Sequence, residues 1–163
     1  MLKKSLYISI FIALLILSLP LYSLRFYKII SKNSPTNKVS NKFVVINDKV
    51  INIEIADTPE KTSKGLSERT NLTTNSGMIF TFSKQDQYPA FWMKDMLIPI
   101  DIIWINDTKI IQIDNNVQPE PGITDTNLTL YRPVSAVDYV LEVNAGYCER
   151  NGIEVGDTVK INF

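Results

Sequence analysis

Histidine is absent from the 163 residues of this chain, and cysteine occurs once, at Cys148. The lack of histidine removes the commonest general base near neutral pH and the commonest zinc ligand. A single cysteine cannot form an intrachain disulfide, and no Cys-x-x-Cys pair is present for redox or metal chemistry. The sequence therefore predicts neither a metal site nor a cofactor.

An excess of charge is also missing, because 17 basic and 17 acidic side chains give a formal net charge of zero. No basic stripe is interleaved with aromatic residues, which is the usual footprint of a surface that binds nucleic acid. Nucleic acid is therefore not an expected partner. A chain of this length allows one globular domain with an appendage.

Charge is absent altogether between Lys4 and Arg25, where the residues are mostly apolar. About 20 such residues suffice to cross a hydrocarbon core as a helix. Residues 1–30 are therefore predicted to be a membrane anchor that enters the lipid bilayer through residues 5–24. The alternatives are a cleaved signal peptide, although no clean small-x-small cleavage site is present, and a buried globular helix.

The orientation of this anchor is inferred from its place in the chain. Lysine and arginine flank both ends of the apolar segment, so the positive-inside rule does not separate the two sides. A four-residue tail followed by a long domain is the usual layout of a signal anchor. We expect a single-pass protein of the cell membrane with its domain outside the cytoplasm, or a secreted domain if the segment is cleaved. Residues 31–42 are polar, contain Pro35 and predict a linker.

Short apolar runs separated by turn residues begin at Phe43 and are typical of strands. The runs "FVVI" and "KVINIEIA" indicate a hairpin that turns at Asn47 and Asp48, and "IDIIWIN" with "KIIQI" indicates a second one at 106–108. The runs "GMIFTF", "YVLEV" and "VKINF" are further strands. We expect six to eight strands over residues 43–163.

One short helix is predicted between the first hairpin and "GMIFTF". Thr58 fits the N-cap, Pro59 fits the first helical position, and Gly65 ends the helix. Few helices and many short strands predict a mainly β (α+β) domain, a small antiparallel barrel-like or sandwich fold with one or two short helices.

Five stretches occur in a specific order: "EIADTPEKTSKGLSER", "GMIFTF", "FWMKDMLIPIDIIWI", "YVLEVNAG" and "GIEVGD". Together they resemble the uncharacterised family catalogued as domain of unknown function 192, also known as uncharacterised protein family 0127. The resemblance covers the chain from about Phe43 to the C-terminus. It implies a small β-rich domain, often preceded by a signal or anchor segment, with no established reaction, substrate or cofactor.

The resemblance rests on a set of matching positions, and the chain departs from the family pattern at one place. The matching positions are Gly65, Leu66, Arg69, Gly77, Met78, Phe80, Phe91, Trp92, Met93, Lys94, Pro99, Asp101, Leu141, Glu142, Ala145, Gly146, Gly156 and Asp157. Where the family tends to have Met-Lys-Asn-Thr, this chain has Asp95 and Met96 after "MK". No role of the family's amide or hydroxyl is therefore carried over, and Cys148 matches no position of the pattern.

The candidates for ligand binding are Arg69, Trp92, Lys94, Asp101 and Glu142. In an extended segment, Trp92 and Lys94 project to one face. They suggest a shallow aromatic pocket with a cation at its rim, suited to a small anionic or carbohydrate-like ligand. The alternative is a core strand in which the stem of Lys94 packs and its ammonium group reaches water.

The charged candidates each have two interpretations. The Asp101 carboxylate either accepts backbone N–H groups where the chain turns into its strand, or pairs with Arg69 in a bidentate contact. Arg69 is otherwise a solvated charge or holds the loop that follows it. Glu142 lies on the polar face of "VLEV", either solvated or as an acidic lining of the same cavity as Lys94.

Three classes of function follow from these candidates, and one of them is an assembly factor that acts through protein contact at the Trp92 surface. The leading one is a domain that binds a small ligand or an envelope protein without catalysis. The alternative is a hydrolase-type enzyme in which Asp101 and Glu142 act as a carboxylate pair, as in a glycosidase, together with Lys94. The sequence does not fix the separation of these carboxylates, so it assigns no catalytic residue.

Overall fold

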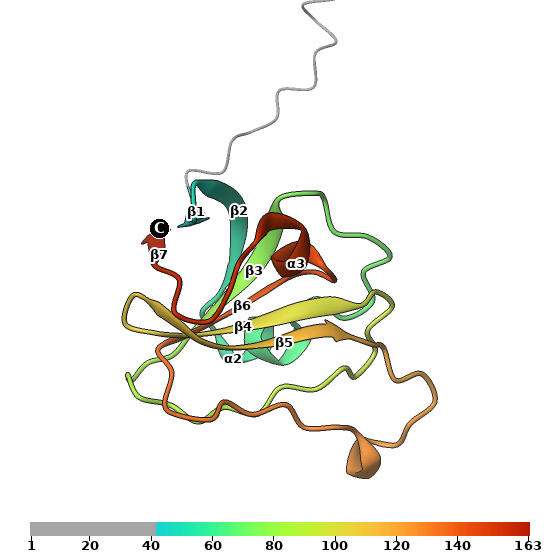
Figure 1. Ribbon diagram of the computed structural model, residues 1–163. Coiled ribbons are helices and arrows are strands. Elements are labelled where there is room, and N and C mark those ends of the chain that lie inside the picture. Colours follow the sequence, from blue (N-terminus) through green and yellow to red (C-terminus); the bar gives the residue numbers. More distant parts are fainter. Residues whose placement is uncertain (1–41) are drawn as a thin grey trace, which may run out of the picture. The chain divides into compact units, whose positions relative to one another are not determined.

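The computed structural model describes residues 42–163 (Figure 1). The predicted anchor, residues 1–30, and all but the last residue of the predicted linker, residues 31–42, lie outside this range. The strands are β1 (Phe43–Ile46), β2 (Lys49–Ala56), β3 (Ser76–Thr81), β4 (Ile100–Asn106), β5 (Lys109–Val117), β6 (Tyr139–Asn144) and β7 (Val159–Asn162). The helices are α2 (Pro59–Lys64), α3 (Tyr147–Asn151) and the 3-10 turn η1 (Asp125–Asn127).

The seven strands form one curled sheet in the order β5-β4-β6-β3-β2-β1-β7. Neighbouring strands are antiparallel except β2 and β3, which are parallel and are connected through α2. The two edges of the sheet meet where Lys109 bridges Thr158 and the N–H of Ile110 donates to the carbonyl of Asp157 over 3.1 Å. The expectation of a mainly β, barrel-like domain is confirmed, in the form of a half-barrel.

Local sequence signals account for both hairpins. Asn47 and Asp48 have φ values of 46° and 62°, as a two-residue type I′ turn requires of both central residues. In the second hairpin Asn106 pairs with Lys109, which leaves Asp107 and Thr108 as the turn. Both predicted turns are confirmed.

Helix α2 also has the predicted boundaries. The Thr58 hydroxyl accepts a hydrogen bond from the N–H of Lys61 over 3.3 Å, and Pro59 begins the helix. The N–H of Gly65 donates to the carbonyl of Lys61 over 2.8 Å and ends it. None of the residues of α2 is buried, so the helix is held by its caps and neighbours rather than by an apolar face in the core.

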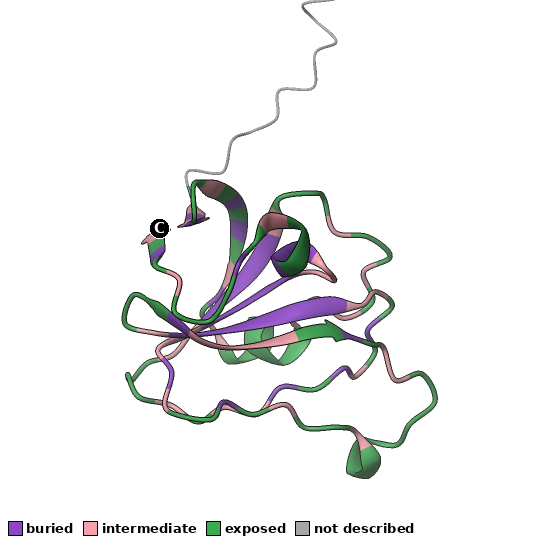
Figure 2. Ribbon diagram, in the orientation of Figure 1, coloured by how far each residue is buried: buried purple, intermediate pink, exposed green. Residues whose placement is uncertain are grey.

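Both faces of the sheet are buried, which gives the domain two hydrophobic cores (Figure 2). Side chains alternate between the faces, so Ile103 and Ile105 belong to one core while Ile102 and Trp104 belong to the other. The first core draws on all seven strands and α3, and lies inside the curl of the sheet. We call the opposite side, which carries Ile102 and Trp104, the outer face.

The outer face is covered by two long connections that run side by side across it (Figure 1). The N–H and carbonyl groups of Phe91 exchange hydrogen bonds of 2.9 Å with those of Tyr131, and Gln87 is bridged to Val137 in the same way. These pairings hold the segment 82–99 beside the segment 118–138. They place Phe91, Met93 and Met96 in the second core although these residues lie outside the strands, while Trp92 and Leu97 of the same run stay exposed.

Among residues 42–163, no helix has the length and apolar character that crossing a bilayer requires.

Candidate ligand-binding site

A cavity of about 550 Å³ lies on the outer face, between α2 and residues 82–96. We call it the outer cavity. Its apolar wall includes Leu66, Phe80, Phe82, Phe91, Trp92 and Met96. Hydroxyl groups from Thr62, Ser63, Ser67 and Ser83 also line it. An apolar wall with a few polar groups is the usual composition of a small-molecule site.

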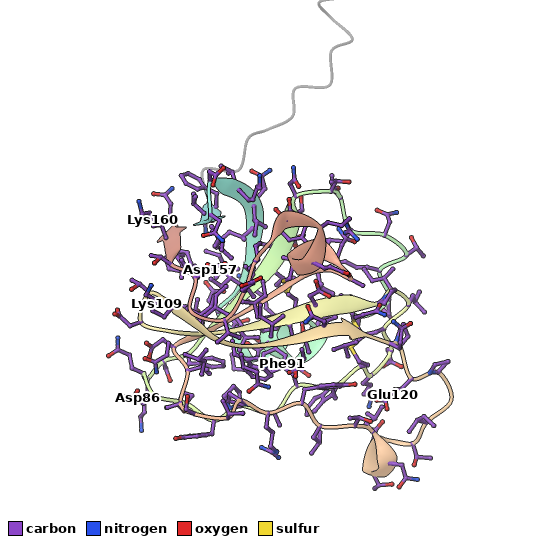
Figure 3. The ribbon with its side chains drawn as sticks, viewed as in Figure 1. Asp86, Phe91, Lys109, Glu120, Asp157 and Lys160 are labelled. Atoms are coloured by element: carbon purple, nitrogen blue, oxygen red, sulfur yellow. The ribbon has the colours of Figure 1, made fainter. Side chains whose placement is uncertain are left out.

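The aromatic part of the wall is fixed by edge-to-face packing. The ring centroids of Phe80 and Phe91 are 4.8 Å apart at 86°, and those of Phe91 and Trp104 are 5.5 Å apart at 85°. Phe91 is seen beneath the sheet in Figure 3. Such pairs add about 0.5–1.5 kcal/mol beyond the burial of their area. The cavity therefore has a preformed aromatic surface.

The opposite wall is α2, which explains why this helix buries none of its residues. Pro59, Thr62 and Ser63 line the cavity instead of packing into a core. The Lys61 ammonium pairs with the Asp57 carboxylate over 2.6 Å, which secures the first turn. The side of the helix that would normally pack is thus available to a ligand.

Glu142 lies on β6 at the base of the outer cavity and is only 6 % exposed. Its cross-strand neighbours are Met78 on β3 and Ile102 on β4, which offer no hydrogen bond from their side chains. Within residues 42–163, its Oε2 is the one buried side-chain nitrogen or oxygen atom without a hydrogen-bond partner. Burial raises the pKa of Glu142 to about 8, while the charge of Arg69 acts in the opposite direction. The solvated interpretation of Glu142 is therefore wrong, because its side chain is buried at the base of the cavity.

Arg69 follows α2 and binds Glu54 rather than Asp101. Its two terminal nitrogens lie 2.5 Å and 2.7 Å from the two carboxylate oxygens of Glu54, a bidentate pair. This contact lowers the pKa of Glu54 and raises that of Arg69. Arg69 therefore lowers the pKa of Glu142 only through its charge, because its guanidinium group is already hydrogen-bonded to Glu54.

Asp101 is fully buried on the inner side of the sheet and binds three backbone N–H groups. They belong to Asn116, at 2.8 Å, and to Gly146 and Cys148, each at 2.9 Å. Asp101 thus fastens β5 and the start of α3 to β4, as the backbone-acceptor interpretation predicts. Burial, and secondarily the neighbouring Asp101 carboxylate, raise the pKa of the Cys148 thiol.

Asp101 and Glu142 cannot act as a carboxylate pair. Asp101 is paired across β4 and β6 with Val143, whereas Glu142 is paired with Ile102. Consecutive residues of a strand point to opposite faces, so the sheet separates the two carboxyl groups. The carboxylate pair of the alternative, hydrolase-type interpretation is therefore wrong, since a glycosidase pair must flank one bond.

Trp92 and Lys94 lie at the mouth of the site. Trp92 is 44 % exposed and lines the outer cavity, whereas Lys94 lines only a smaller hollow of about 290 Å³ that shares Trp92 with it. The Lys94 ammonium forms an ion pair with Asp125 of η1. Lys94 therefore does not supply a cation to the rim of the outer cavity, and its ammonium group is already occupied by Asp125.

Among the five candidates, the structure brings Trp92 and Glu142 together in one cavity. The hydroxyl groups of α2 were missed by the sequence analysis. A signal for them exists in the sequence, because "PEKTSK" is a well-capped helix without a large apolar residue. Within residues 42–163, no group of three or more Cys, Asp or Glu residues is placed to hold a metal ion.

A small half-barrel with a covered outer face and a side cavity defines the structural class of this domain. The chain belongs to the family domain of unknown function 192 (DUF192), whose model, described as "Uncharacterized ACR", matches residues 42–161. This confirms the resemblance inferred from the motifs.

Two solved structures have the same fold. A protein of unknown function from Novosphingobium aromaticivorans is 32 % identical, with a TM-score of 0.65, over 72 % of this chain and 83 % of that one. A protein from Sinorhizobium meliloti, described as a proposed transcription regulator, is 27 % identical, with a TM-score of 0.66, over 74 % of this chain and 92 % of that one. No curated protein matches the chain.

Proposed function

We propose that this chain is a membrane-anchored extracytoplasmic domain that binds a small ligand in the outer cavity. The observation that carries the proposal is the buried carboxyl group of Glu142, whose Oε2 has no partner within the described domain. Leaving a buried polar group without a hydrogen bond costs about 1–3 kcal/mol. Such a group at the base of a cavity is understandable if a ligand supplies the missing contact.

The size and lining of the cavity support the same function. Its volume of about 550 Å³ suits a molecule of metabolite size, since small-molecule pockets span about 300–1,000 Å³. The aromatic wall provides apolar area, and Ser63 and Ser67 provide hydrogen-bonding groups on the facing side. A cavity with this lining is a better candidate for a ligand site than the single exposed side chains on the rest of the surface.

The ligand-binding proposal is tested with a thermal-shift screen of small metabolites on the full chain in detergent. We expect one or more compounds to raise the melting temperature, with the shift lost in Trp92→Ala. Tyr88→Ala is the matched control, because Tyr88 is an aromatic residue of the same segment that is 65 % exposed and does not line the cavity. The proposal fails if no compound acts, or if the shifts survive in both Trp92→Ala and Glu142→Gln.

The membrane part of the proposal is supported by the uncharged apolar stretch between Lys4 and Arg25. We expect the full chain to remain in the membrane fraction after alkaline extraction. A tag at the C-terminus should be degraded when protease is added to cells whose outer envelope layers have been removed but whose plasma membrane is intact. A chain found in the soluble cytoplasmic fraction would contradict the anchor, without bearing on the cavity.

A further inference from the structure

The charges around the outer cavity indicate the class of its ligand, an inference that rests on the proposed function. We infer that the cavity takes a small aromatic amine, whose ammonium group pairs with the Glu142 carboxylate while its ring lies against Phe91 and Trp92. The acid is at the base and the aromatic residues form the wall, so one molecule with both groups reaches both.

The first step is that the base of the cavity holds an acid without a matching cation. The charged residues that line the cavity are Asp57, Lys64 and Glu142. Lys64 lies on α2 with its ammonium group 3.4 Å from Glu68, and Asp57 is paired with Lys61. Glu142 is therefore the one lining charge within residues 42–163 to which no ion pair is assigned.

The second step is that Arg69 does not fill this role. Its guanidinium group binds both carboxylate oxygens of Glu54. Glu54 on β2 pairs with Met78 on β3, which in turn pairs with Glu142 on β6. Oε2 of Glu142 has no hydrogen-bond partner, so Arg69 makes no hydrogen bond to this oxygen atom. The positive charge of Arg69 thus lies near the Glu142 carboxyl group, but the direct contact with this group is left for a ligand.

The third step is the aromatic wall. The ring of an aromatic ligand can pack against such a wall in offset-stacked or edge-to-face geometry. Trp92 is half-exposed at the mouth, and Phe80 and Phe91 are fixed in edge-to-face contact deeper inside. An anionic ligand would meet a buried acid and an electron-rich wall. The anionic ligand expected from Lys94 is therefore not favoured by this cavity.

Binding of an ammonium group should release the proton of the Glu142 carboxyl group. Below pH 8 the carboxyl group of Glu142 is mostly protonated in the free protein, because burial raises its pKa to about 8. To form the ion pair, this carboxyl group gives its proton to the buffer while the amine keeps its own. The affinity should rise by up to about tenfold per pH unit below pH 8 and then level off.

Few other groups act on this titration. Met78 and Ile102, which flank Glu142 in the sheet, are uncharged, as are the residues of 82–96 that line the cavity. Arg69 with Glu54 faces Glu142 from the side of β2, and Asp57 with Lys64 faces the cavity from the side of α2.

The test is isothermal titration of the full chain in detergent with benzylamine, benzyl alcohol and benzoate, which share one ring and differ in charge. Each is measured at pH 6 in phosphate and in Bis-Tris, and at pH 8 in phosphate and in Tris. We expect benzylamine to bind about tenfold or more tightly than benzyl alcohol at pH 8, and benzoate not to bind. At pH 6 the difference in heat between the two buffers should report the release of about one proton.

Two variants locate the effect. Glu142→Gln should weaken benzylamine binding at pH 8 by about tenfold or more and remove its pH dependence, with benzyl alcohol binding unchanged within about threefold. Glu149→Gln, which changes an exposed glutamate on α3 that does not line the cavity, is the matched control and should leave both affinities unchanged. The proton release is measured on the unmodified protein, so it decides the inference even if Glu142→Gln fails to fold.

The failures of the two proposals are distinguishable. If benzyl alcohol binds as tightly as benzylamine and both are weakened by Trp92→Ala, the ammonium preference is wrong while the cavity remains a ligand site. If benzylamine binds without releasing a proton at pH 6, or does not bind, the inference is overturned. The metabolite screen then decides the proposed function separately.

Discussion

Two buried carboxyl groups on neighbouring strands, Asp101 and Glu142, have opposite surroundings. Asp101 accepts three backbone N–H groups, whereas Oε2 of Glu142 accepts none. A carboxylate that is held by several N–H groups stabilises the fold, whereas one without partners is a cost to it. The first is therefore a structural residue and the second a candidate for contact with something outside the chain.

The stability of the domain should decrease with rising pH because of Glu142. Its pKa in the folded state, about 8, lies above the ordinary value of 4.5 for a glutamate, so the folded state binds the proton more tightly. This contribution is present in full below about pH 4.5 and is lost as the pH rises through 8. Urea denaturation should show a loss on the order of 3 kcal/mol between pH 5 and pH 8 that Glu142→Gln lacks.

Arg69→Gln provides a check on this pH dependence. Loss of the guanidinium charge removes the influence that lowers the pKa of Glu142, so the decline in stability should extend to higher pH. A pH profile that is identical in the unmodified protein and in Glu142→Gln would contradict the assignment to Glu142.

Asp101→Asn should destabilise the domain without touching the outer cavity. The amide nitrogen of asparagine cannot accept the N–H groups that a carboxylate oxygen accepts. We expect a loss of about 2 kcal/mol for Asp101→Asn and about 4 kcal/mol for Asp101→Ala, measured by urea denaturation. Asp107→Asn, in an exposed turn, is the control and should change stability by less than about 0.5 kcal/mol. An equally small effect at Asp101 would contradict its fastening role.

At the scale of elements, α2 has little packing of its own. Its residues are all unburied (Figure 2). The helix also borders the outer cavity. The helix therefore depends on the Thr58 cap and on the Lys61–Asp57 ion pair. A bound ligand would replace the missing apolar contact and stabilise it.

Thr58→Ala should loosen α2 without unfolding the sheet. Loss of an N-cap side chain costs about 1 kcal/mol, and here the loss falls on a helix of six residues. Hydrogen exchange should become faster in α2 and stay unchanged in β3 and β6. A ligand of the outer cavity should slow exchange in the same helix. Thr74→Ala, at an exposed threonine outside any helix, serves as the control.

The sequence predicts those elements whose signals are local. The Asn47 and Asp48 turn and the Thr58 cap each depend on a few consecutive residues, and both have the predicted geometry. The parallel pairing of β2 with β3 and the burial of Glu142 depend on segments that are distant in the chain. Alternation along "YVLEV" indicates which residues share a face, but it does not reveal that segments 82–99 and 118–138 cover the polar one.

At the scale of the whole molecule, the β3–β6 pair joins the two halves of the sheet. Gly77 on β3 lies opposite Val143, and a Cβ atom at Gly77 would lie 2.5 Å from the carbonyl oxygen of Glu142. This oxygen belongs to the backbone of β6, so the clash is relieved only if the two strands move apart. Such a movement disturbs both hydrophobic cores at once.

Gly77→Ala should therefore lower the stability of the entire domain, by about 3 kcal/mol, although it adds a single methyl group. The loss should be the same by tryptophan fluorescence and by far-UV circular dichroism, because the two cores share this pair of strands. Ser76→Ala, one residue earlier on β3, should cost less than about 0.5 kcal/mol. Separate transitions by the two probes would show that the cores unfold independently.

Strands β1 and β7 are neighbours, with Phe43 paired to Asn162, so the two ends of the domain emerge at one point. A chain that enters and leaves at one point can be spliced into a surface turn of a host protein, or circularly permuted, without rearranging any strand. A short linker from residue 163 back to residue 43, with new ends opened beside exposed Gly122, should give a permuted protein that keeps the same sheet order.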